Sequence, residues 1–349
     1  MAPTRAPSPL WLAMLLALSL AQVPSSGCGP SDFRPPSLVD RPRIVGMITS
    51  VAADATRATP VGGERVTVTP VLVEPEGEEG TLSTLWLACL AAPTRSGLPS
   101  CGSMPLAFGG PAAPGVVSPI VIDLPPIPPS PFGAPSLLLT LASCDGGATP
   151  ALPADATSAT QPTCTGGAED ARAELTVFTM PVGLEAEGAN HHPSIDDEEI
   201  ALRIGMGEER VWEATADPLP SGGCAALAET AALPRVTVTE TDIPVVTLGW
   251  TSGPDDRETY EVFIEGASVA ERRREALQIS HFVTAGTFER QFSAVESGDP
   301  DDVRPEIEWT PPSRGDIDAA GEVVRFWWVA RDLRGGMDVV ARVLCVAPG

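Results

Sequence analysis

Short apolar runs separated by glycine and proline fill the chain from residue 43 to its end. In residues 66–69 (VTVT) the valines face one way and the threonines the other, which is the pattern of a half-buried strand rich in β-branched residues. Many short strands punctuated by turns are typical of a sandwich, so we expect an all-β protein. The expected strands are residues 43–51, 65–73, 82–90, 116–124, 136–143, 173–182, 199–205, 210–215, 235–239, 244–250, 259–265, 277–284, 306–309, 323–331 and 339–346.

The strand pattern stops and restarts around residues 188–194 (GANHHPS). We therefore expect one β-sandwich domain at 43–187 and a second at 195–349, joined by 188–194, with Asn190 to Pro193 as an exposed joint. A length of 349 residues with 43% hydrophobic residues is enough for two cores.

For three segments outside the regular strand pattern, the sequence predicts a particular structure. The proline-rich stretch 125–131 should cross outside the sheets, because proline lacks the N–H that a central strand needs. The polar stretch 145–170 is too poor in apolar residues to pack alone. Residues 267–276 mix glutamate with three arginines, and they should form a short helix or a charged, solvated loop.

The first 27 residues have the order of a secretory signal. Arg5 precedes an apolar run at 10–21 (LWLAMLLALSLA), and small residues follow. The run is shorter than the roughly 20 residues of a membrane-spanning helix. We expect residues 1–27 to be a signal peptide.

The sequence Pro-Ser-Ser-Gly-Cys that ends at Cys28 resembles a lipobox, the site at which lipoprotein signal peptidase cuts before a lipidated cysteine. The resemblance implies that Cys28 carries the lipid, with palmitate among its acyl chains, and that Gly29, which is not aspartate, favours the outer membrane. Ser25 departs from the aliphatic residue usual at its position. Ordinary secretion, with Cys28 as a disulfide partner, is the alternative.

Residues 28–42 read as the lipidated cysteine and a proline-rich tether, because four prolines hold this segment extended. The expected contacts are with the membrane through the lipid, and with an envelope protein or polysaccharide.

Cysteine count agrees with lipidation of Cys28. The other six cysteines form an even set, which in an exported chain indicates disulfides. Six cysteines allow 15 full pairings, and proximity within each expected domain favours local bonds. The expected pairs are Cys89–Cys101, Cys144–Cys164 and Cys224–Cys345.

A formal net charge of −24 argues against nucleic acid and anionic lipid surfaces as partners. All 22 basic residues are arginine, which excludes lysine-dependent mechanisms such as Schiff bases. Acidic clusters at 196–199, 255–256 and 299–302 lack the spaced pattern of a calcium loop. We interpret them as solvated loops, with calcium binding as the alternative, and expect no metal and no cofactor.

No catalytic motif stands out: the chain has no Gly-x-Ser-x-Gly, His-Glu-x-x-His or Cys-x-x-Cys sequence. His191 and His192 are neighbours in an extended link, so they should point to opposite sides and not share a metal. Ser280 and His281 are neighbours in a strand and cannot form a dyad, so His281 should be structural. A pair of carboxylates suited to glycoside hydrolysis is beyond what sequence can identify.

Aromatic residues concentrate at Phe326, Trp327 and Trp328, where alternation places Trp327 on the face opposite the other two. We expect Trp327 to be a contact between domains; a sugar-stacking platform is the alternative.

Two resemblances complete the interpretation. Val66, Val68 and Trp86, and then Val245, Leu248, Trp250 and Trp328, resemble core positions of immunoglobulin-like or PKD-like modules of bacterial surface proteins. The chain also looks like uncharacterised surface lipoproteins of GC-rich Gram-negative bacteria. That likeness lies in the lipidated cysteine, the RPRIV opening at 41–45, the link at 190–193, the TAG turn at 284–286 and the RDLRGG turn at 331–336.

We therefore expect a lipid-anchored envelope protein with two β-sandwich domains and a non-catalytic structural or binding role. The alternative is a carbohydrate-binding module or a carbohydrate-active enzyme of the cell surface. A fold by itself says little about function.

Overall fold

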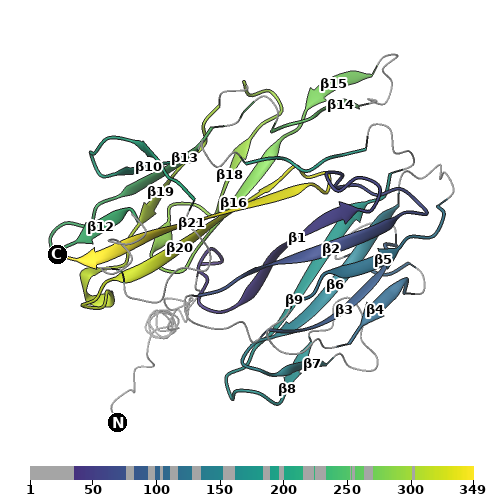
Figure 1. Cartoon of the computed structure of the whole chain (residues 1–349), viewed down its shortest axis with the longest axis horizontal. Coiled ribbons are helices and arrows are strands. Elements are labelled where there is room, and N and C mark those ends of the chain that lie inside the picture. The colour runs from purple at the N-terminus through teal and green to yellow at the C-terminus, as the bar shows by residue number, and fades with distance from the viewer. Residues whose placement is uncertain are drawn as a thin grey trace, which may run out of the picture. The chain divides into compact units, whose positions relative to one another are not determined.

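The computed structural model describes residues 35–349 except 76–81, 93–98, 103–104, 111–116, 128–134, 152–161, 184–188, 196–199, 215–223, 225–232, 252, 254–255, 263–269 and 301–302. The expected signal peptide, Cys28 and Gly29 lie outside the described residues, as do the acidic cluster 196–199 and most of the proline-rich stretch 125–131. In the described part nearly all of the regular secondary structure is β-strand, which confirms the expected all-β sandwich fold (Figure 1).

The first sandwich pairs a three-stranded sheet with a four-stranded sheet, both antiparallel. Side chains that alternate inward from both sheets form one core, which includes Met47, Val66, Ile122, Leu139 and Met180. The sheets are β1 (Arg43–Val51), β2 (Arg65–Val73) and β5 (Ile120–Asp123), and, in the order β4-β3-β6-β9, β3 (Ser83–Leu90), β4 (Ala107–Gly109), β6 (Ser136–Cys144) and β9 (Ala173–Pro181).

The second sandwich has two five-stranded sheets. One runs β11-β10-β13-β19-β17, with β10 (Ile200–Ile204), β11 (Arg210–Val211), β13 (Val246–Trp250), β17 (Thr287–Phe288) and β19 (Glu306–Thr310). The other runs β12-β21-β20-β16-β18, with β12 (Arg235–Val238), β16 (Leu277–Val283), β18 (Phe292–Val295), β20 (Glu322–Arg331) and β21 (Met337–Pro348). A 3-10 turn, η2 (Arg314–Asp316), lies between β19 and β20.

Aromatic packing centres the second core on Phe326. The rings of Trp309 and Trp212 meet Phe326 edge to face, with centroids 4.9 and 5.2 Å away. Trp328, on the same face of β20, packs against Trp212. The expected division of the aromatic run between two faces is therefore correct.

The expectation of a short helix or a charged loop at residues 267–276 is wrong for residues 271–274, because these residues form a strand. β15 (Glu271–Arg274) pairs with β14 (Thr259–Val262) in a two-stranded hairpin. The strand consists of Glu-Arg-Arg-Arg and is largely exposed. Its charged side chains therefore remain solvated while its backbone pairs with β14.

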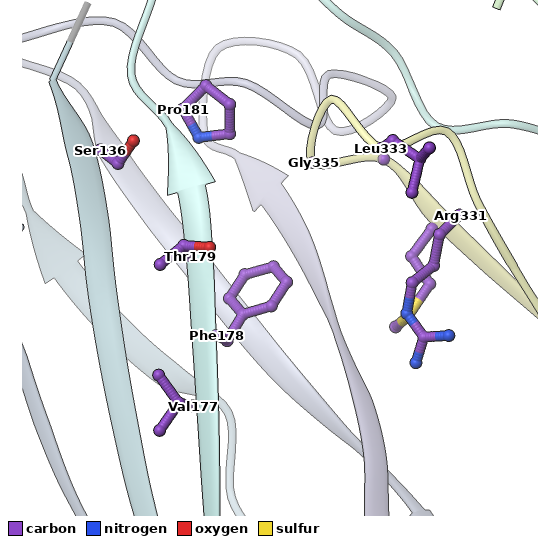
Figure 2. A pocket seen from close by; sticks show the side chains of 10 residues that line it. Ser136, Val177, Phe178, Thr179, Pro181, Arg331, Leu333 and Gly335 are labelled. Atoms are coloured by element: carbon purple, nitrogen blue, oxygen red, sulfur yellow. The ribbon is translucent and has the colours of Figure 1, made fainter. Parts of the chain in front are cut away.

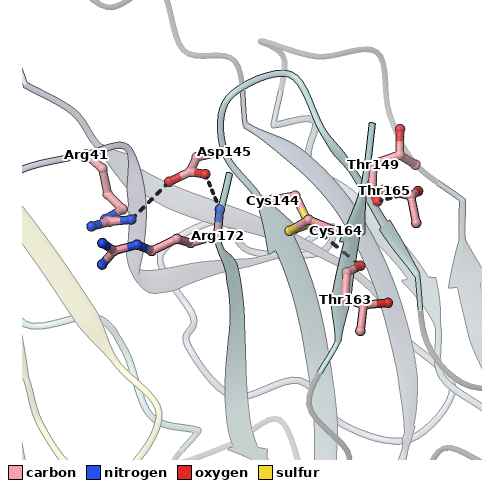
Figure 3. Close-up of a disulfide and its surroundings, with 8 residues drawn as sticks. All are labelled: Arg41, Cys144, Asp145, Thr149, Thr163, Cys164, Thr165 and Arg172. Carbon is pink, nitrogen blue, oxygen red and sulfur yellow. Dashed lines mark hydrogen bonds and ion pairs between the residues drawn. A yellow bond between two sulfur atoms is a disulfide. The ribbon is translucent and has the colours of Figure 1, made fainter. Parts of the chain in front are cut away.

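The three disulfides join the pairs expected from the sequence: Cys89–Cys101, Cys144–Cys164 and Cys224–Cys345. Cys144–Cys164 closes the polar stretch after β6, where two short strands, β7 (Thr149–Ala151) and β8 (Thr163–Thr165), pair with each other (Figure 3). Asp145 fixes the base of this loop, since its carboxylate accepts a hydrogen bond from the Arg172 N–H at 2.6 Å. No helix in the described part of the chain has the length and apolarity needed to cross a membrane.

Candidate functional site at the junction of the two sandwiches

Apolar side chains from both sandwiches meet in a cluster that we call the apolar junction. Val45 and Val73 of the first sandwich pack there with Val329 and Met337 of the second, and Trp327 packs against them. Trp327 is therefore a contact between the sandwiches, as expected from the sequence. Burial of this apolar surface holds β1 and β2 against β20 and β21.

The segment before β1 also belongs to this junction. Ser37 and Val39 are buried, and both hydrogen-bond to Val283 of β16, Val39 through its N–H and Ser37 through its carbonyl. The expectation of a tether over residues 28–42 is thus wrong for its last part: the extended, proline-bearing chain is docked as a strand-like edge of β16 from residue 37.

The link between the sandwiches is buried, which overturns the expectation of an exposed joint. Asn190 is 3% exposed, and its carbonyl accepts the N–H groups of Ala58 and Thr59. His192 donates its N–H to the carbonyl of Thr56. The link is buried because its backbone hydrogen-bonds to the loop after β1, and sequence periodicity does not reveal such contacts. The domain boundary itself stays a prediction.

A turn between β20 and β21 faces this link. The carboxylate of Asp332, 2% exposed, accepts the N–H groups of Arg334 at 2.7 Å and Gly336 at 2.8 Å, and the side-chain amide of Asn190 at 2.6 Å. One buried carboxylate therefore fixes the 331–337 turn and fastens it to the link.

The two histidines of the link point to different partners. His191 Nδ1 lies 2.5 Å from Glu258 Oε1. His192 Nδ1 accepts the N–H of Met337 at 3.0 Å, so its proton lies on Nε2, which donates to the Thr49 carbonyl at 2.7 Å. His192 thus bridges β1 and β21. Within the described residues, no group of three or more metal-binding side chains is found here or elsewhere.

Two glutamates and an arginine complete what we call the polar junction, together with Asn190, His191 and Asp332. Arg334 Nη1 lies 2.5 Å from Glu275 Oε1 and 3.8 Å from Glu258 Oε2. Burial and the nearby charge of Asp332 raise the pKa of Glu275 to about 7, although Arg334 and the Glu258 N–H act in the opposite direction.

This carboxylate pair bears on the carbohydrate-active alternative. A glycosidase needs an open gap between its two carboxyl groups for the sugar. Here Arg334 contacts both carboxylates and stacks on Tyr260, 4.2 Å from the ring centroid, and Glu275 is only 1% exposed. The arrangement is therefore suited to joining β14, β15 and the 331–337 turn.

His281 hydrogen-bonds to Ser293 of β18, at 2.9 Å from Nε2 to Oγ, and not to its neighbour Ser280. Sequence reasoning missed Ser293 because the pairing of β16 with β18 was not expected. Burial lowers the pKa of His281 to about 3, and both side chains are buried. This serine–histidine pair lies within the core, so a structural role fits it, as expected for His281.

A pocket of ≈ 300 Å³ opens beside the junction (Figure 2). One wall is the β9 strand with Val177, Phe178, Thr179 and Pro181, next to Ser136 of β6. The opposite wall is the 331–337 turn, with Arg331, Leu333, Gly335, Gly336 and Met337. We call this pocket the junction groove. The sequence had singled out the RDLRGG turn at 331–336 as part of a resemblance, but it did not indicate that this turn lines a pocket with β9.

No protein-family model matches the chain, and no curated protein is detectably similar in sequence.

Proposed function

We propose that the protein is a lipid-anchored cell-envelope protein with a non-catalytic structural or binding role. The observation that carries the proposal is the pairing of the cysteines. All six cysteines after Cys28 are joined in three disulfides, two of them closing loops within the first sandwich and one spanning the second. Disulfides persist in oxidising compartments, which supports export.

The same pairing leaves Cys28 as the odd cysteine of seven. A thiol without a partner in an exported chain favours another use, and the lipobox-like sequence before it supplies one. From Cys28 to Ser37, the first docked residue, the chain is nine residues, which span at most about 32 Å. On this proposal the sandwiches stay close to the membrane surface.

The binding half of the proposal is supported by the junction. Contacts that bury Asn190 and Asp332 and partly bury Trp327 join the sandwiches, and both sandwiches form the groove beside them. The sugar-binding alternative finds less support, because none of the tryptophans in the described part of the chain is exposed.

Lipidation is tested by mass spectrometry of the protein extracted from membranes of a Gram-negative host. The expected result is an N-terminal peptide that begins at Cys28 and carries acyl chains, and partition of the protein into detergent. Cys28→Ser should abolish both. Ser25→Leu is the matched control, since it restores the aliphatic residue of the lipobox and should leave lipidation intact. An unmodified Cys28 inside a longer mature chain would overturn the proposal.

A further inference from the structure

The groove wall formed by β9 is an open sheet edge. β9 is the last strand of its sheet, and within the described residues no strand pairs with its outer side. Edge strands are protected by charges and proline, and here Glu174 and Pro181 stand at the two ends. The residues between them, 175–180 (LTVFTM), carry no charge. This stretch is therefore a template for an added strand.

Leu333 faces this edge from the other wall. It is 69% exposed, and in the described part of the chain it is the one residue other than glycine with a positive φ, 62°. A leucine gains nothing structural from that position, where asparagine or glycine would be unstrained. The Asp332 carboxylate holds the turn rigid around it. The fold thus presents an apolar side chain to the groove in a fixed, strained conformation.

Arg331 adds a positive charge. Its guanidinium donates to two neutral acceptors, Ser280 Oγ and the Val45 carbonyl, and it makes no ion pair within the described residues. A cation on a groove wall that lacks a counter-ion favours a carboxylate on whatever fills the groove.

We propose that the junction groove binds an extended peptide segment of another envelope protein, which adds a strand to β9. An apolar side chain of the peptide packs between Phe178 and Leu333, and a carboxylate lies beside Arg331 (Figure 2). Backbone hydrogen bonds to β9 supply affinity, and the two side-chain contacts supply selectivity. This inference deepens the proposed binding role and rests on it.

Selection from a random eight-residue peptide library displayed on phage, against the purified mature protein, tests the proposal. The expected peptides share an apolar residue close to an aspartate or glutamate. Synthetic copies of a selected peptide should bind at least tenfold more weakly after backbone N-methylation at alternate residues, and about tenfold more weakly after Asp→Asn or Glu→Gln. Peptides that bind equally well after N-methylation would overturn strand addition, and failure to select any peptide would overturn the site.

The Leu333→Asn variant distinguishes a loss of peptide binding from a loss of folding. Asparagine adopts the left-handed conformation more readily than leucine, so the variant should melt roughly 1 to 3 °C higher and lose at least tenfold in affinity for the selected peptide. Phe108→Asn is the matched control, because Phe108 is 76% exposed on β4, outside the groove, and should leave affinity unchanged. Equal affinity of the wild type and Leu333→Asn would refute the groove. Cys28 acylation, measured on the same sample, reports separately on the anchor.

Discussion

Asp332 is the residue whose removal should damage the junction most. Its carboxylate is 2% exposed and accepts three hydrogen bonds, from the backbone N–H groups of Arg334 and Gly336 and from the Asn190 amide. Asp332→Ala leaves these three donors without their acceptor. An unpaired buried donor costs about 1 to 3 kcal/mol, so the free energy of unfolding should fall by about 4 kcal/mol.

Asp332→Asn is the informative comparison. It keeps one oxygen for the two backbone N–H groups and places an NH₂ toward Asn190. The side-chain oxygen of Asn190 is buried without a hydrogen-bond partner, so rotation of that amide turns the oxygen toward the new donor. The loss should then be about 1 to 2 kcal/mol. Asp332→Asn also removes a charge that raises the pKa of Glu275, so this pKa should fall.

Urea unfolding at pH 7, followed by tryptophan fluorescence, measures both losses, and carboxyl ¹³C chemical shifts follow the titration of Glu275. The reasoning fails if alanine and asparagine cost the same, because the cost would then come from lost charge and not from unpaired donors. It also fails if Asp332→Ala costs less than about 1 kcal/mol.

Three further predictions use the same structure. The folded-state pKa of Glu275, about 7, lies above its ordinary value of 4.5, so between these pH values the folded protein binds more protons than the unfolded chain. The free energy of unfolding should therefore fall by up to about 3 kcal/mol as pH rises from 4.5 to 7. Urea titrations at stepped pH should show this fall in the wild type and a flatter dependence on pH in Glu275→Gln. The Cys224–Cys345 disulfide spans 121 positions of the chain, whereas Cys89–Cys101 spans 12. Loss of the longer closure by Cys345→Ser should lower the free energy of unfolding by about 5 kcal/mol, and Cys101→Ser should lower it by about 3 kcal/mol. Equal melting temperatures of the two variants would contradict that ranking. Trp327→Ala should cost about 2 to 3 kcal/mol by calorimetry, and a loss no larger than that of the exposed control Phe292→Ala would show that the apolar junction contributes little.

The strands were predictable because each long one carries its own signal. β1, β2 and β20 largely alternate buried side chains with less buried ones within nine or ten residues, and their bounds agree with the expected ranges almost residue for residue. The strands that sequence reasoning missed are short: β17 has two residues, β8 has three, and β15 and β18 have four each. A run that short has no period, and it becomes a strand only because a neighbouring strand pairs with it.

The site could not be predicted in the same way, because its contacts join distant parts of the chain. Asn190 and Asp332 are 142 positions apart, and the Arg331 contact with Val45 spans 286. Neither sequence neighbourhood indicates a partner. One local signal was present: an aspartate followed by two glycines at 335 and 336 is typical of a turn fixed by its own side chain. That signal predicts the turn, but not that it faces the link.

Under the proposed anchoring, the docking of residues 37–39 on β16 determines which sandwich receives a force applied at Cys28. The chain hydrogen-bonds to Val283 of the second sandwich before it enters β1 of the first. A pull on Cys28 is therefore delivered first to the second sandwich and, a few residues later, to the first. Because both sandwiches share the load, the tether does not pull one away from the other. The walls of the junction groove come one from each sandwich. Under the proposed anchoring, the groove should therefore keep its shape when the tether is pulled.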